Sequence, residues 1–122
     1  MNKFDGIFVS GAPLDLLQMH QSIVLRAYAG KRNGKMFAKA NPINYIDEHS
    51  DVPMLCIHGE KDGLVEYPAA KTFIEKMESI HPNLIRHHFV PGGTHVGGFE
   101  WVYKDNDTRK VILEWLEDLR DV

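Results

Sequence analysis

Three short segments that end at glycine or proline constrain the fold of this 122-residue chain more than any other feature. The first is the apolar run 6–9, followed by Ser-Gly-Ala-Pro. The others are 52–58, closed by Gly59, and 84–90, closed by Pro-Gly-Gly. A continuous apolar run with such an end is typical of a strand buried on both faces. We therefore predict three strands, the first two of them buried.

Helical patterns separate and follow these strands. Pro68 suits the first turn of a helix that Pro82 ends, and a last helix with one apolar stripe begins near residues 105–108. Residues 14–50 form a less regular insert, in which we predict short helical stretches at 14–17, 23–25 and 41–46 and a basic, glycine-punctuated loop at 30–34. The order predicts one domain over residues 1–122, an α/β fold with a parallel three-stranded sheet and flanking helices.

The composition argues against several classes of partner. The formal net charge is −3 and the basic residues are scattered, so we expect no binding to nucleic acid or to an anionic membrane. No apolar stretch reaches the roughly 18 residues of a membrane span, and the N-terminus does not resemble a signal peptide. We expect a soluble, cytoplasmic chain.

The polar residues of types used in catalysis fall on the loops after the second and third strands, where functional residues of parallel sheets gather. Segment 58–65 reads HGEKDGLV and segment 91–99 reads PGGTHVGGF. These loops resemble the acid and histidine loops of the α/β-hydrolase superfamily, H-G-x-x-D-x-x-V and G-x-x-H. Segment 41–46, NPINYI, is similar to the stretch before the acid strand in prolyl-oligopeptidase-like peptidases and related esterases.

The resemblance runs from about residue 4 to the C-terminus and implies the C-terminal portion of an α/β-hydrolase fold. Matched residue by residue, it makes Asp62 the orienting acid and His95 the general base of a serine hydrolase triad. A serine hydroxyl needs a neighbouring imidazole to accept its proton, and a carboxylate holds that imidazole in the right tautomer. The substrate would be a small-molecule ester or a peptide, with no cofactor and no metal.

The nucleophile of this superfamily is missing from the sequence. No G-x-S-x-G pattern is present, and Ser10 has Phe8 and Ala12 where glycines belong. Both oxyanion donors of the family also lie upstream of the acid. We therefore expect a C-terminal fragment of the catalytic domain that is inactive alone and that self-associates, or binds a partner chain, through the exposed strand edge at 6–9.

Two other functions remain open. The chain is alternatively a truncated, non-catalytic paralogue that acts as a binding or assembly partner. A flavodoxin-like binding module is a weaker alternative, because Pro13 removes a backbone N–H from the turn that would bind phosphate.

Several other residues have simpler interpretations. Asp15 is an alternative acid but fits the family pattern less well than Asp62. Cys56, the only cysteine, is expected to be a buried, inert thiol, and His58 a structural hydrogen-bonding residue. Adjacent side chains of a strand point to opposite faces, which argues against a metal site at 87–88. Three aromatic residues are expected to pack in the core or at its edge rather than to line a pocket: Phe99, Trp101 and Tyr103.

Overall fold

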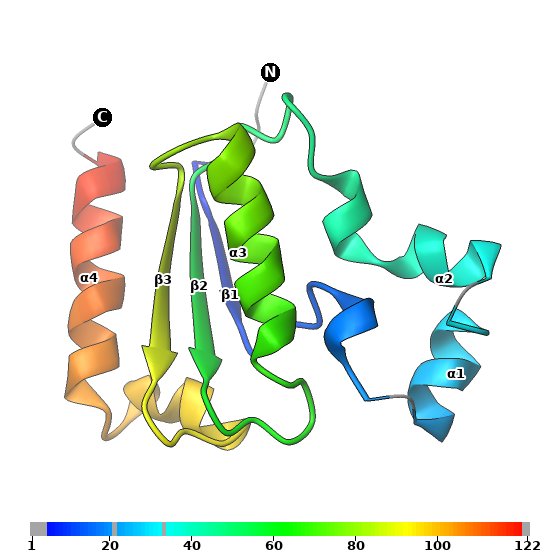
Figure 1. Ribbon diagram of the computed structural model, residues 1–122. Coiled ribbons are helices and arrows are strands. Elements are labelled where there is room, and N and C mark those ends of the chain that lie inside the picture. The colour runs from blue at the N-terminus through cyan, green and yellow to red at the C-terminus, as the bar shows by residue number, and fades with distance from the viewer. Residues whose placement is uncertain (1–4, 21, 33, 121–122) are drawn as a thin grey trace.

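The computed structural model describes residues 5–20, 22–32 and 34–120. Its sheet contains β1 (Ile7–Ser10), β2 (Met54–Gly59) and β3 (Ile85–Val90), in the spatial order β1-β2-β3. Both pairings are parallel, with Ile7 opposite Met54 and Met54 opposite Ile85. The strands therefore end at one side of the molecule, where the arrowheads of β2 and β3 point in Figure 1. The predicted α/β fold with a parallel three-stranded sheet is confirmed.

Two long helices cover opposite faces of the sheet. Along β2, Met54 and Cys56 pack against α3 (Pro68–Ile80), whereas Leu55 and Ile57 pack against α4 (Asn106–Arg120). This alternation follows from the two-residue period of a strand, and burial on both faces explains why every residue of β2 is inaccessible. As predicted, α3 begins at Pro68 and ends before Pro82.

The insert between β1 and β2 forms a separate small layer. It contains η1 (Leu16–Gln18), α1 (Ile23–Ala29), α2 (Lys35–Ala40) and η2 (Pro42–Tyr45), and Figure 1 shows α1 and α2 beside the sheet, on the side away from α4. Its own apolar cluster consists of Leu16, Leu25, Ala29 and Phe37. The sequence did not predict α2, which begins directly after the glycine-punctuated loop.

Burial of β1 differs from the prediction. Ile7 is 41% exposed and Phe8 36% exposed, because β1 has a hydrogen-bonded neighbour on one side only within the described part of the chain. The expectation of a strand buried on both faces is therefore wrong for β1 and right for β2. The apolar edge that we expected at this strand is present.

Candidate functional site

The loop after β2 holds Asp62 in a tight turn. Asp62 Oδ1 accepts the backbone N–H groups of Leu64, at 2.9 Å, and Val65, at 2.8 Å. Aspartate commonly closes a turn on the backbone two or three residues ahead, which explains why this residue type suits the position. The Asp62 side chain is fully buried, and its second oxygen, Oδ2, remains available to another partner.

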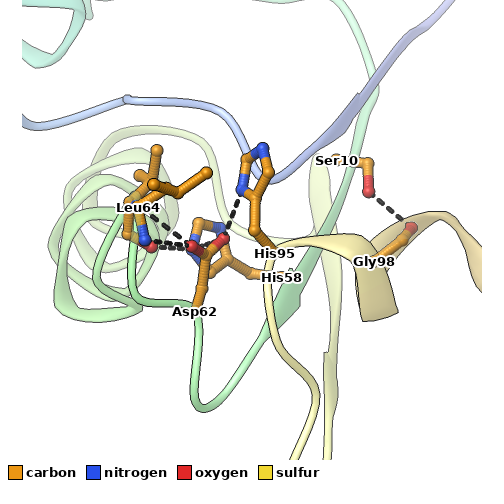
Figure 2. A network of polar contacts seen from close by, with 7 residues as sticks. Ser10, His58, Asp62, Leu64, His95 and Gly98 are labelled. Atoms are coloured by element: carbon orange, nitrogen blue, oxygen red, sulfur yellow. Dashed lines mark hydrogen bonds and ion pairs between the residues drawn. The ribbon is translucent and has the colours of Figure 1, made fainter.

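The loop after β3 brings His95 to that second oxygen. His95 Nδ1 lies 2.8 Å from Asp62 Oδ2, and because a carboxylate only accepts, Nδ1 carries the donated hydrogen. The His95 side chain is 31% exposed and meets the Phe99 ring edge-on at 5.9 Å between centroids. Nε2 has no hydrogen-bonding partner among the described residues, so it is free to exchange a proton (Figure 2).

Two main-chain hydrogen bonds fasten the loops to each other. The N–H of Glu60 donates to Val90 O at 3.1 Å, and the N–H of Lys61 donates to Gly93 O at 2.8 Å. The candidate acid and the candidate base therefore stand on loops whose backbones are joined just before Asp62 and just before His95.

The surroundings of Asp62 favour its ionised form. Burial raises the pKa of the Asp62 carboxyl, but the hydrogen bonds from Val65 N–H, from the His95 ring and from Leu64 N–H together outweigh burial. The net result is a pKa below the ordinary aspartate value, to which the charge of a protonated His95 also contributes. An aspartate that stays ionised at neutral pH is suited to orient an imidazole and to stabilise its cation.

His58, the last residue before Gly59, lies beneath the same carboxylate. Its Nε2 is 2.6 Å from Val65 O and 3.5 Å from Asp62 Oδ2, and its side chain is completely buried. The expected structural hydrogen bond is confirmed. Figure 2 shows Asp62 between the rings of His58 and His95.

Ser10 and Asp15 form hydrogen bonds with residues other than Asp62 and His95. Ser10 Oγ donates to Gly98 O at 2.7 Å, and in Figure 2 this hydroxyl points away from His95. Asp15 Oδ2 accepts the Thr72 hydroxyl at 2.7 Å, and its Oδ1 accepts the Asn41 amide at 3.1 Å. Asp15 thus ties the insert to α3 and does not contact His95.

An apolar cavity of about 530 Å³ lies between the insert and the Asp62 loop. Its walls include Leu16, Leu25 and Tyr28 from the insert and Leu64 and Val65 from the loop. Residues 63–66, which directly follow Asp62 in the chain, form one wall of this cavity, whereas Asp62 and His95 do not line it. Its lining suits an apolar group better than a charged one.

Of the remaining candidates, Cys56 and Trp101 contribute to packing, whereas the expected packing is wrong for Tyr103, which is 65% exposed. Cys56 is 1% exposed, and burial raises the pKa of its thiol to about 12, as expected for an inert thiol. Trp101 packs in the cluster under α4, whereas Phe99 contacts His95, a site contact that the sequence had not indicated. Among the described residues, no group of three His, Cys, Asp or Glu side chains is arranged to hold a metal ion.

Sequence reasoning missed two glycines that shape the site. Gly11 has a φ of +63°, and a Cβ there would lie 3.0 Å from His95 Cε1. Gly59 passes against the backbone of residues 93–94. Gly11 directly follows β1 and Gly59 is the last residue of β2, and this position at a strand end is the signal by which they are recognised.

A comparison with known protein families now adds to this geometry. The sequence model of the BD-FAE family matches residues 11–77, which is more than half of the chain. The match includes Asp62 but ends before His95, so the contact between them is a separate structural observation. No curated protein and no solved structure matches the chain. Within the described residues, no helix has both the length and the apolar character to cross a membrane. The chain belongs to the BD-FAE family, a hydrolase-like domain of the α/β-hydrolase type of esterase.

Proposed function

We propose that this chain provides the acid and the base of a serine ester hydrolase, with Asp62 and His95 in these roles. One observation carries the proposal: a buried, ionised carboxylate accepts Nδ1–H of a partly exposed imidazole whose Nε2 is free. This arrangement suits proton transfer at Nε2.

The chemistry follows from the two ring nitrogens of His95. As a serine hydroxyl attacks the ester carbonyl, Nε2 accepts the hydroxyl proton and the ring becomes a cation that Asp62 stabilises. When the tetrahedral intermediate collapses, Nε2 returns that proton to the leaving alcohol. Water then attacks the acyl-enzyme by the same route and releases the carboxylic acid. Asp62 stays ionised throughout.

We propose that the nucleophile comes from residues outside positions 1–122, so that this chain is the C-terminal portion of the catalytic domain. Ser10, the candidate within the chain, donates its hydrogen to Gly98 O instead. The free edge of β1 supports the proposal, because His95 packs against Gly11 at the carboxyl end of that strand. A further parallel strand beside β1 would end at the same side of the sheet as His95.

The cavity next to Asp62 favours an ester with an apolar acyl or alcohol group. Membership of an esterase-type family also supports an ester over a peptide bond, which remains the finer alternative. A tight fit of that group would fix the carbonyl near His95.

The test uses the chain together with the coding sequence that precedes Met1. We expect the extended protein to hydrolyse p-nitrophenyl esters better than matched p-nitroanilides. In His95→Gln and Asp62→Asn, kcat should fall by up to about 10⁴-fold with a smaller change in KM. His87→Gln, an exposed histidine of β3, is the matched control and should keep full activity.

Two outcomes would contradict the proposal. Equal activity of His95→Gln and wild type would remove His95 from the mechanism. Labelling of Ser10 by a fluorophosphonate probe on the 122-residue chain would show that the nucleophile lies within it. If the upstream sequence encodes no serine elbow and the extended protein is inactive, the non-catalytic binding partner becomes the better assignment.

A further inference from the structure

His58 is a fully buried residue that contacts both Asp62 and Val65, at the two ends of the Asp62 turn. It stands at the end of β2, and its Nε2 lies 2.6 Å from Val65 O. A carbonyl oxygen only accepts, so Nε2 carries the hydrogen and the ring is in its Nε2–H tautomer. The same N–H lies 3.5 Å from Asp62 Oδ2, the oxygen that accepts from His95.

The bond from His58 closes the loop that carries Asp62. Val65 is held at both its backbone polar groups, because its N–H donates to Asp62 Oδ1 and its C=O accepts from His58. The carboxylate is thereby fixed by Oδ1, and Oδ2 is turned towards His95. Loss of the His58 bond would free the Val65 carbonyl and loosen the turn in which the N–H groups of Leu64 and Val65 hold Asp62 Oδ1.

The chemistry of the ring argues against a role in packing alone. His58 Nδ1 is buried and has no hydrogen-bonding partner in the described part of the chain. An unpaired buried polar atom is destabilising, and a leucine or phenylalanine at this position would avoid that cost. The hydrogen bond from His58 Nε2 to Val65 O compensates for this cost.

We propose that His58 is a positioning residue of the site, which acts through Val65 and Asp62 to set the tautomer of His95. The inference rests on the proposed function for its role in a triad, but its geometry is testable without turnover. His58 touches no substrate in this assignment.

The experiment is NMR of the 122-residue chain with ¹⁵N-labelled histidine, at a pH where the imidazoles are neutral. Long-range ¹H–¹⁵N correlations distinguish the Nδ1–H and Nε2–H tautomers of each ring. In wild type we expect His95 to be predominantly Nδ1–H, because Asp62 accepts from that nitrogen. In His58→Phe, we expect a mixture in which the ratio of Nδ1–H to Nε2–H falls at least threefold.

Three further variants separate positioning from stability. His58→Gln places an amide N–H where Nε2 was and should restore the wild-type ratio, whereas the shorter His58→Asn should not. Ile57→Val, in the same strand and equally buried, should lower the unfolding free energy without changing the tautomer ratio of His95. If His58→Phe fails to fold, the tautomer ratio of His95 in His58→Gln compared with that in His58→Asn tests the inference.

An unchanged His95 tautomer in both His58→Phe and His58→Asn would overturn the inference, as would a wild-type ring that is not predominantly Nδ1–H. A tautomer that depends on His58 would sustain it, even if His95→Gln left ester hydrolysis by the extended protein intact. Intact ester hydrolysis in His95→Gln would contradict only the proposed function.

Discussion

Gly59 passes so close to Gly93 that a Cβ atom at residue 59 would lie 2.4 Å from the Gly93 carbonyl oxygen. The same carbonyl accepts the N–H of Lys61 at 2.8 Å. The close approach of these two backbone segments sets the distance between the Asp62 loop and the His95 loop. The site therefore depends on the absence of a side chain at residue 59.

Gly59→Ala should destabilise the chain strongly. The added methyl group would meet backbone atoms, which move less easily than side chains, so we expect a loss of about 3 kcal/mol or more of unfolding free energy in urea titrations. Gly63→Ala, in the same loop with no atom within 4 Å of its Cβ position, should change it by less than about 0.5 kcal/mol. Equal losses of unfolding free energy in Gly59→Ala and Gly63→Ala would contradict this close approach of residues 59 and 93.

Gly11→Ala should perturb His95 beyond its effect on stability. Gly11 and Gly92 have φ values of +63° and +65°, so alanine at either should cost roughly 1–2 kcal/mol of backbone strain. Only the Cβ at residue 11 would contact the His95 ring. We expect the ring resonances of His95 to shift in Gly11→Ala and to remain in place in Gly92→Ala. In the extended protein, kcat should fall at least tenfold in Gly11→Ala alone.

The sequence predicted those parts of the fold where local and tertiary preferences agree. The strand β2 and the helix α3 carry clear apolar patterns and end at glycine or proline, so their positions followed from the chain order. The 3₁₀ segment η3 (Val96–Val102) was not predicted, because Gly97 and Gly98 are typical of a loop. Gly98 is needed because a Cβ there would lie 2.9 Å from Ser10 Oγ, a contact between residues far apart in the sequence.

For the candidate site, Asp62 and His95 were chosen from loop patterns, and the structure brings them into contact. The prediction that β1 is buried was wrong, because burial depends on the neighbouring strands. An apolar run indicates only that a strand is suited to burial. His58 belongs to the H-G-x-x-D-x-x-V pattern and Gly11 follows a strand, but neither signal assigns the residue a role in the site. Their roles arise from the distances to Val65 and His95.

Acid should destabilise the chain through Asp62. Its pKa is lowered in the folded state, so its contribution is fully present above the ordinary aspartate value of about 4 and is lost as the pH falls through the lower, folded value. Below about pH 4, the unfolding free energy of wild type should therefore decrease more steeply than that of Asp62→Asn. Parallel curves would mean that Asp62 is not held by these hydrogen bonds.

Cys56 should be unreactive in the folded chain. With its thiol buried and its pKa raised to about 12, almost no thiolate is available to attack a disulfide reagent at pH 8. We expect labelling by Ellman's reagent only on the timescale of unfolding, and rapid, stoichiometric labelling in denaturant. Fast labelling under native conditions would show that β2 is accessible.

The outer edge of β1 should cause self-association of the 122-residue chain. The N–H of Ile7 donates to Pro53 O, just before β2, and that of Gly11 donates to Ile57 O in β2. The alternation of a strand therefore directs the N–H groups of Phe8 and Ser10 outwards. A charge on such an edge opposes pairing with another strand. Ile7→Lys should therefore lower the weight-average mass in sedimentation equilibrium. Leu113→Lys, on α4 and 54% exposed against 41% for Ile7, is the matched control and should leave that mass unchanged. A monodisperse wild-type monomer would contradict a role for this edge, whereas recovery of a monomer in the extended protein would indicate that the preceding segment covers β1.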